Sequence, residues 1–428
     1  MDHTAHIGAA VQSKKKGLLI RCHSNNQRMK ENVYRKHLLI SVIYFGIAAV
    51  LGVLLRSYPI FSFGFNYRYV VHAHSHIALL GWVYIALTTL LHYCFVDIGA
   101  AGKSYKRIFW GTQITLIGML FTFPFQGYAL FSIIFSTLFL IVSYIYTYHF
   151  WKNIDSKYKH SKSLLCAKAA LIYMAISSLG PWALGAIMSA LGAQSVWYRL
   201  SIYLYLHFQY NGWMMLALVG LIVYAIEQHG QELPNKMFTR FFWTLNTGVV
   251  LTFFLSTLWT EPTLWLNILG GLGALAQFYA FALLWALIKN KARKLFFSKV
   301  QKLFLISVVI LGCIKIMLQF ITAFPYFAQM ATNYLDLTIG YLHLTFLGVI
   351  SLGLFLLMDY YQLFRISKKS FLWYFSGFVL TESLIFYKGF AAWLQWTVFK
   401  EYLSVLTICS LLILLGLISM IIQNQRKT

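Results

Sequence analysis

Long apolar runs recur along the chain, separated by short stretches that contain charged residues, proline, glycine or asparagine. A run of about 20 apolar residues is long enough to cross a bilayer as a helix. The fold class that this pattern predicts is an all-α membrane protein with twelve transmembrane helices. The predicted helices cover residues 37–57, 67–95, 106–124, 127–150, 164–192, 198–226, 239–259, 262–288, 300–323, 334–361, 370–391 and 398–423.

Composition agrees with a membrane protein, because 60% of the 428 residues are hydrophobic and only 11% are charged. Residues 1–36 are polar and basic, and they contain no apolar segment followed by a small-residue cleavage site. We therefore expect a basic cytoplasmic tail over 1–36 instead of a cleavable signal peptide. The transmembrane domain is expected over 37–423, and a short cytoplasmic C-terminus over 424–428.

The distribution of basic residues predicts the orientation. If the N-terminus is cytoplasmic, 29 of the 35 lysines and arginines fall on the cytoplasmic side, 5 fall on the outer side, and Lys315 lies inside a predicted helix. Cytoplasmic loops of membrane proteins carry such an excess of positive charge. We therefore expect both termini in the cytoplasm. The net charge of +24 is explained by contact with anionic lipid, and it requires no nucleic-acid partner.

Histidines are the main candidates for chemistry, because polar side chains inside a membrane are costly and usually functional. Residues 72–82 read HAHSHIALLGW. The five histidines inside predicted helices are His72, His74, His76, His207 and His343. The others lie in the tail, in loops or at helix ends. For these, including His37, His92 and His149, we expect interfacial or solvated side chains.

The local sequence around these histidines repeats. His76, His207 and His343 each begin the pattern His-x4-Gly, and they are 131 and 136 residues apart, which is four predicted helices each time. This predicts three repeats of a four-helix unit, over about 37–150, 164–288 and 300–423. Since the glycine at i+5 points away from the histidine, we expect it to let a neighbouring helix approach closely.

The predicted depths of the histidines also match. Arg68 and Arg199 each lie eight residues before a histidine, so that His76 and His207 lie about 12 Å below an interfacial arginine. A histidine in a membrane can serve as an interhelical hydrogen-bonding group. Imidazole is also the usual nitrogen ligand of haem iron and copper. Three histidines at one depth favour haem or metal binding.

Twelve helices with histidines in the outer half of helices 2, 6 and 10 resemble subunit I of the haem-copper oxidase superfamily. The segment HSHIALLGW is similar to helix 2 of its divergent members, the cbb3-type oxidases, nitric oxide reductases and NnrS-type proteins. The resemblance implies three four-helix arcs, haem of b type with copper as a further possibility, and an electron-donor subunit or quinol as partner. It also implies the inner membrane of a prokaryote.

Within this resemblance, the helix-2 ligand of the low-spin haem is His76 or His74, and the helix-10 ligand is His343. His207 is similar to the helix-6 copper ligand, and His72 could be a second metal contact. The family's high-spin haem ligand on helix 10 corresponds to Tyr341 in this sequence. Arg68 and Arg199 are candidates for pairing with haem propionates, although arginines at helix ends also extend to the membrane interface without such a partner.

One departure from the family concerns copper. The family has a His-His pair on helix 7, whereas residues 239–259 contain no histidine. We therefore expect an incomplete binuclear centre and a bis-histidine haem suited to electron transfer or to chemistry related to dioxygen or nitric oxide. The alternative arrangement is a three-imidazole copper site formed by His207, one helix-2 histidine and His343.

Two charged residues in predicted helices remain. Lys315 and Glu382 are expected to form an ion pair, which would offset the cost of burying each charge, or to contact protons or quinol. The alternative functions are a non-catalytic haem or copper sensor or assembly factor, and a twelve-helix transporter. The five scattered cysteines predict no disulfide framework, zinc site or covalently attached haem.

Overall fold

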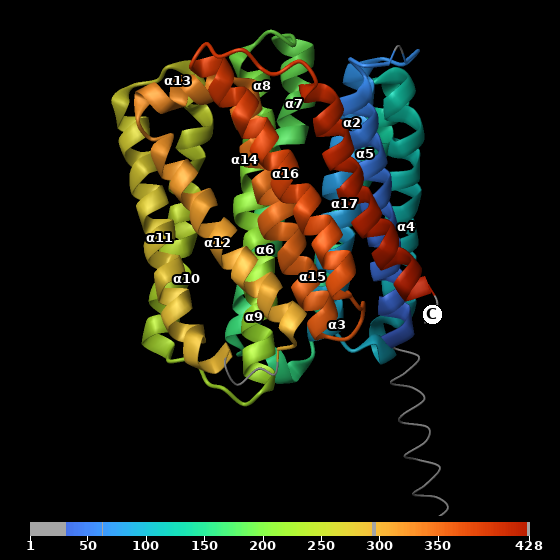
Figure 1. Cartoon of the computed structure of the whole chain (residues 1–428). Helices are drawn as coiled ribbons and strands as arrows, with labels where there is room; N and C mark the ends of the chain where they lie inside the picture. Colours follow the sequence, from blue (N-terminus) through green and yellow to red (C-terminus); the bar gives the residue numbers. More distant parts are fainter. Residues whose placement is uncertain (1–30, 62, 293–296, 426–428) are drawn as a thin grey trace, which may run out of the picture.

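The computed structural model describes residues 31–61, 63–292 and 297–425, which form a bundle of long helices (Figure 1). No β-strand forms among these residues, apart from a single bridge between Val96 and Ile154. Most of the predicted tail at 1–36 and part of the C-terminus at 424–428 lie outside the described residues.

The helix bounds follow the apolar runs. The first described helix, Glu31–Ser57, is called the N-terminal helix below. The helices that follow it in the first half of the chain are α2 (Tyr67–His76), η1 (Ile77–Tyr84), α3 (Ile85–Phe95), α4 (Ile98–Gln126), α5 (Leu130–Lys152), η2 (Ser156–Tyr158), α6 (Lys162–Ser177), α7 (Leu179–Ala190), α8 (Val196–His207) and η3 (Phe208–Met214). Those in the second half are α9 (Met215–Gln228), α10 (Asn235–Thr252), η4 (Phe253–Thr260), α11 (Leu264–Ala292), α12 (Lys299–Ile321), α13 (Pro325–Asn333), α14 (Leu335–His343), η5 (Leu344–Ile350), α15 (Ser351–Tyr360), α16 (Lys368–Trp393) and α17 (Tyr402–Gln425).

Eleven helices of the described chain are long and apolar enough to cross a membrane, and their bounds lie within a few residues of eleven of the predicted segments. The all-helical fold is therefore confirmed for the described residues, and eleven of its helices are candidate membrane spans. The remaining predicted segment, 370–391, forms the 26-residue helix α16. This helix is not among the eleven, and the charged side chain of Glu382 near its middle makes it less apolar.

Two local features have clear causes. The segment predicted at 164–192 is divided at Ser178 into α6 and α7, three residues before Pro181. A proline lacks the N–H donor and crowds the preceding turn, so the helix is interrupted there as expected for a kink. The short helix α13 begins with Pro325 at its first position and was not predicted, because it lies in a connection between two spans.

Three continuous helical segments occupy the interior. We call Tyr67–Phe95, Val196–Gln228 and Leu335–Tyr360 the first, second and third inner helices. The most apolar windows of these segments are 89, 94 and 72% buried, against at most 44% for the other eight candidate spans. The inner helices therefore form the core, and the other helices surround them.

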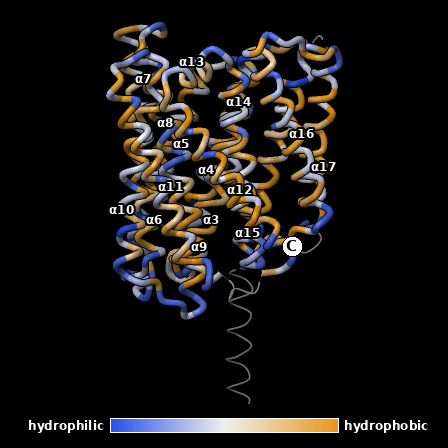
Figure 2. Tube along the Cα trace, turned by 60° about the vertical axis from the view of Figure 1, so that its left-hand side comes forward, coloured by the Kyte–Doolittle hydropathy of each residue, from blue (hydrophilic) through white to orange (hydrophobic). Residues whose placement is uncertain are grey.

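Contacts between side chains join the inner helices. The indole N–H of Trp82 in the first inner helix donates to Oγ of Ser351 in the third at 2.8 Å. The ring centroids of Tyr84 and Trp213 lie 6.5 Å apart and join the first to the second. Hydrophobic residues fill the middle of the bundle and hydrophilic ones gather at its two ends (Figure 2). The described chain begins and ends at the same end of the bundle (Figure 1).

Candidate functional site

Each inner helix changes geometry directly after its histidine. The α-helix ends at His76, His207 and His343, and a π-helix of seven or eight residues follows each time. A π-helix has wider turns than an α-helix and is frequent at functional sites. The local structure around the His-x4-Gly pattern therefore recurs in all three inner helices.

The glycine of each pattern lies in the π-helix and contacts a neighbouring helix, as expected. A Cβ added to Gly81 would lie 2.8 Å from the ring of Tyr44, and one added to Gly212 would lie 2.6 Å from the ring of Tyr173. Gly348 is similarly close to Phe378, at 2.8 Å. Only glycine allows these aromatic rings to approach the backbone without a rearrangement.

Burial also changes at the histidines. The π-helices and the helices that follow them are almost entirely buried, whereas α2, α8 and α14 contain many partly exposed residues. For example, the side chain of His343 is 25% exposed although it belongs to an inner helix. The histidine-bearing halves of the inner helices are therefore less completely covered than the halves that follow them.

His74 faces the N-terminal helix. Its Nδ1 lies 2.8 Å from the carbonyl oxygen of Ala48, so this nitrogen carries the proton and donates it. A Cβ at Gly52 would lie 3.1 Å from the His74 ring, which places the ring directly against that helix. No hydrogen bond to Nε2 of His74 occurs among the described residues, so this nitrogen retains a lone pair for a ligand.

His343 lies beside a carboxylate. Its Nδ1 is 3.9 Å from Oε1 of Glu382, which is itself 8% exposed. The distance is too long for a hydrogen bond, and neither Nδ1 nor either carboxylate oxygen has a hydrogen-bond partner among the described residues. Arg56 lies within electrostatic range of His74, His343 and Glu382. Four polar groups from four helices therefore gather in one region of the bundle.

His72 and His76 face a different side of the first inner helix. His76 stacks on Phe123 of α4 with 4.3 Å between ring centroids, and its Nδ1 lies 2.8 Å from the backbone oxygen of His72. The hydroxyl of Tyr128 lies 3.4 Å from Nε2 of His76, and its ring lies 4.6 Å from that of His72. His72 and His76, four residues apart, therefore share one face of the helix, and that face packs against aromatic rings.

Both nitrogens of His207 have protein partners. Its Nε2 donates to the carbonyl oxygen of Val249 at 2.8 Å. Its Nδ1 lies 3.2 Å from Nδ2 of Asn211 and 3.3 Å from Oγ of Ser256. The neutral imidazole then has its proton on Nε2 and its lone pair on Nδ1 engaged, so a metal could bind only after this network rearranges.

The expected ion pair between Lys315 and Glu382 is not formed. The ammonium group of Lys315 donates to the amide oxygens of Asn211 at 2.5 Å and Gln319 at 2.6 Å. It lies 5.9 Å from the centroid of the Tyr210 ring. The prediction was wrong because the positions of two charged residues within their helices do not show whether those helices are neighbours or which side chains face each other.

The remaining predicted site residues are placed as follows. Arg68 and Arg199 are exposed, and the guanidinium of Arg199 lies 5.3 Å from the centroid of the Trp259 ring. Tyr341 is partly buried in α14, and its hydroxyl has no hydrogen-bond partner among the described residues. The predicted ligands thus occupy three separate surroundings, and the described part of the chain contains no group of three or more histidine, cysteine or acidic side chains that could hold a metal ion.

Sequence reasoning missed one polar cluster. His37, His92 and His149, expected at the interface or in solvent, are 5, 0 and 6% exposed. They are buried because the aromatic rings of Phe109 and Tyr105 stack on them and their nitrogens find partners inside the bundle. The sequence contained a partial indication of this burial, since His92 lies inside the predicted helix 67–95 and Tyr105 directly precedes the predicted helix 106–124. Spacing along the chain alone could not show that the two side chains meet.

Comparison with known proteins does not assign the chain to a family. The chain matches no protein-family model, and no curated protein matches it.

Proposed function

We propose that this chain is a membrane haemoprotein that transfers electrons, with a b-type haem held between the first and third inner helices. His74 and His343 would hold it. The observation that supports this most directly is the state of the two imidazoles, because each lies on an inner helix and keeps Nε2 without a hydrogen-bond partner among the described residues. Nδ1 of His74 donates to Ala48, and Nδ1 of His343 lies 3.9 Å from a carboxylate oxygen of Glu382. Histidines that bind metals are usually oriented in this way by their second nitrogen.

The choice between His74 and His76 follows from their contacts. Ala48 holds the ring of His74 against the N-terminal helix, on the side of the cluster that also contains His343 and Arg56. His76 stacks on Phe123 and lies within reach of Tyr128. His74 is therefore the better candidate ligand, with His72 and His76 packing behind it.

The charged residues of the cluster fit the periphery of a haem. Arg56 would provide positive charge for a propionate, and Glu382 would accept a hydrogen bond from Nδ1 of His343 after a shift of less than about 1 Å. Arg68 and Arg199 are exposed and are less suited to this role.

A haem with two imidazole ligands supplies reversible one-electron transfer and leaves no open position for a gas. The chain's own residues would position the ring, balance its charge and exclude water. The engagement of both nitrogens of His207 supports electron transfer over a binuclear copper centre.

The architecture that we propose is that of a divergent haem-copper-oxidase-like subunit with twelve spans. A chain that begins and ends at the same end of the bundle crosses it an even number of times, which favours α16 as the twelfth span. The protein would lie in the inner membrane of a prokaryote. Both termini would be on the cytoplasmic side, because the basic residues concentrate on the side where the termini lie. An electron-donor subunit or quinol would be the partner.

The test is the reduced-minus-oxidised visible spectrum of the detergent-purified chain, with haem and metal analysis of the same sample. Sharp α and β bands with one haem per chain are expected. Stoichiometric copper without haem would instead support a copper-binding protein. If neither is bound after expression with haem and copper supplied, the proposal is wrong and a transporter becomes the better hypothesis.

A further inference from the structure

A chain of hydrogen bonds links three buried side chains near the end of the bundle at which the described chain begins. The hydroxyl of Tyr34 lies 2.8 Å from Nδ1 of His92. Nε2 of His92 lies 3.3 Å from Nε2 of His149, and the two rings are nearly coplanar, at 4°. The three residues come from the N-terminal helix, α3 and α5. None of them belongs to the proposed haem site.

Asn153 determines where the protons lie in this chain. Its Nδ2 donates to the backbone oxygen of His149 at 2.7 Å and lies 3.3 Å from Nδ1 of the same residue. An amide nitrogen has only hydrogens to offer, so Nδ1 of His149 accepts. The proton of neutral His149 is then on Nε2 and is donated to Nε2 of His92. His92 in turn has its proton on Nδ1 and donates it to Tyr34.

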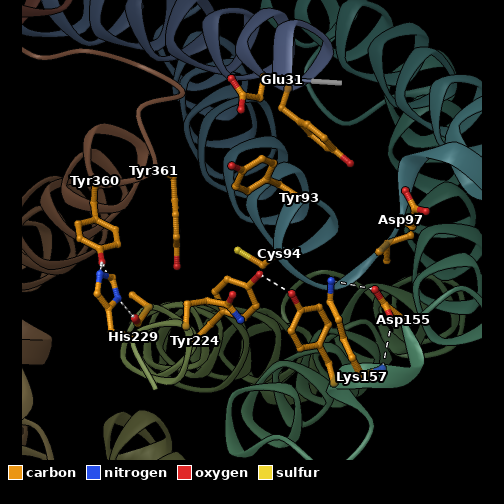
Figure 3. Close-up of a pocket in the computed structure, with 15 residues that line it drawn as sticks. Glu31, Tyr93, Cys94, Asp97, Asp155, Lys157, Tyr224, His229, Tyr360 and Tyr361 are labelled. Atoms are coloured by element: carbon orange, nitrogen blue, oxygen red, sulfur yellow. Dashed lines mark hydrogen bonds and ion pairs between the residues drawn. The ribbon is translucent and has the colours of Figure 1, made fainter. Parts of the chain in front are cut away.

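Tyr34 connects this chain to a cavity. The cavity has a volume of about 570 Å³ and lies where the ends of several helices meet (Figure 3). Its wall includes Tyr34, Tyr93 and Tyr361, with Glu31 at its edge. Since Tyr34 accepts from His92, its own hydroxyl hydrogen is available to water in the cavity. The histidine pair is therefore buried and yet only one hydroxyl away from solvent-accessible space.

Among the described residues, no carboxylate or ammonium group forms a hydrogen bond with either histidine, whereas Glu31, Asp97, Asp155 and Lys157 line the adjoining cavity. Other titratable or charged groups that face the histidine pair or its partners come from the N-terminal helix, α3, the start of α4, and α5, and they are His37, Tyr93, Cys94, Asp97, Tyr105, Lys106 and Tyr146. Most of these are neutral groups that can donate or accept. An added proton would be shared mainly between the two imidazoles.

We infer that His92 and His149 form a proton-binding site that exchanges one proton with the cavity beside it. In the loaded state, the additional proton is on Nδ1 of His149, the amide of Asn153 gives up its bond to that nitrogen, and the pair holds three protons on four nitrogens. The proton between the two Nε2 atoms is shared. When Nδ1 of His92 releases a proton to the cavity through Tyr34, the shared proton moves onto Nε2 of His92, and Tyr34 then donates to Nδ1 of His92. Asn153 donates to Nδ1 of His149 again once the remaining two protons have exchanged back to Nε2 of His149 and Nδ1 of His92.

Substitutions at the two ends of this hydrogen-bond chain, Asn153 and Tyr34, should change the proton affinity of the histidine pair in opposite directions. Asn153→Asp places an acceptor beside Nδ1 of His149, so it favours the loaded state. Tyr34→Phe removes the acceptor from Nδ1 of His92, so it favours the unloaded state. Each change is expected to alter the proton affinity of the pair by about tenfold, which is about one pH unit. Tyr93→Phe is the matched control, because Tyr93 also lines the cavity without a hydrogen bond to either histidine among the described contacts.

The measurement is deuterium exchange at the ring carbon of each histidine, followed by mass spectrometry of the full-length protein in detergent between about pH 5 and pH 8. This exchange depends on protonation of the imidazole. Coupled titration of His92 and His149, moved up by Asn153→Asp, moved down by Tyr34→Phe and unchanged by Tyr93→Phe, supports the site. The inference is overturned if neither histidine titrates in the wild type or in Asn153→Asp, or if the two variants move the titration in the same direction. Gel filtration and the haem spectrum of each variant show whether it is folded, and their outcome does not depend on the proton site.

Discussion

The ammonium nitrogen of Lys315 lies 2.5 Å from the amide oxygen of Asn211 in the interior of the bundle, and no carboxylate of the described residues contacts it. Asn211 in turn lies 3.2 Å from Nδ1 of His207. A buried lysine is thus joined by one amide to the histidine that resembles a copper ligand. This part of the core therefore contains a buried lysine side chain that is hydrogen-bonded to two amides.

This arrangement predicts an asymmetry between two substitutions. Lys315→Met removes the cost of burying a charge but leaves the amide oxygens of Asn211 and Gln319 without their donor, so we expect the two effects to offset and the net change in stability to be small. Asn211→Leu leaves the ammonium group with one fewer acceptor and should cost about 1–3 kcal/mol. Thermal unfolding in detergent, followed by fluorescence, compares the two. A larger loss for Lys315→Met would contradict the contact pattern.

The proposed haem ligands give a prediction about cofactor content. His74→Ala and His343→Ala should each remove nearly all bound haem while the protein still inserts and runs as one species in gel filtration. His207→Ala is the matched control and should retain haem, because both of its nitrogens bond to protein groups. The amount of haem bound per chain in each of the three variants is measured by the pyridine haemochromogen spectrum. Equal haem loss in all three variants would indicate general unfolding.

The close approach at Gly212 gives a prediction about packing. A Cβ there would lie 2.6 Å from the ring of Tyr173, so Gly212→Ala forces the ring or the helix to move and should destabilise the protein by about 1–3 kcal/mol. Gly312→Ala is the control, since no atom lies within 4 Å of its added Cβ. That variant should be neutral or slightly more stable. Equal thermal stability of the two variants would contradict the predicted contact.

A loop outside the membrane gives a pH prediction. The carboxylate of Asp155 accepts a hydrogen bond from the backbone N–H of Lys157 at 3.1 Å and lies 3.1 Å from its ammonium group, and these contacts lower the pKa of Asp155. A lowered pKa in the folded state stabilises the protein above the ordinary aspartate value of about 4, and this contribution is lost as pH falls through the lowered pKa.

The substitution Asp155→Asn should therefore cost less than about 1 kcal/mol at neutral pH, since the pair is partly exposed, and nothing at pH values below the lowered pKa. Thermal unfolding of the wild type and the variant at a series of acidic pH values measures the difference. A difference that stays constant with pH would show that the carboxylate charge plays no part.

Apolar length was sufficient to predict the spans, because the bilayer requires an unbroken apolar helix of a given length whatever the neighbours are. Eleven segments were found within a few residues of their bounds. The His-x4-Gly pattern also predicted that Gly81, Gly212 and Gly348 would permit close contact. That inference needed only the direction of side chains on a helix.

The pairing of polar side chains could not be predicted in this way. Lys315 contacts Asn211 and not Glu382, His74 faces Ala48, and His92 lies against His149 although 57 residues separate them. Helix rotation and order around the bundle decide these contacts, and a periodic apolar sequence is compatible with many such arrangements. The sequence by itself determined that this chain forms a membrane-spanning helical protein and which histidines lie within it. Only the tertiary structure decided which of them retain a free nitrogen and which are bonded to one another, because a hydrogen bond depends on atoms brought within about 3 Å from distant helices.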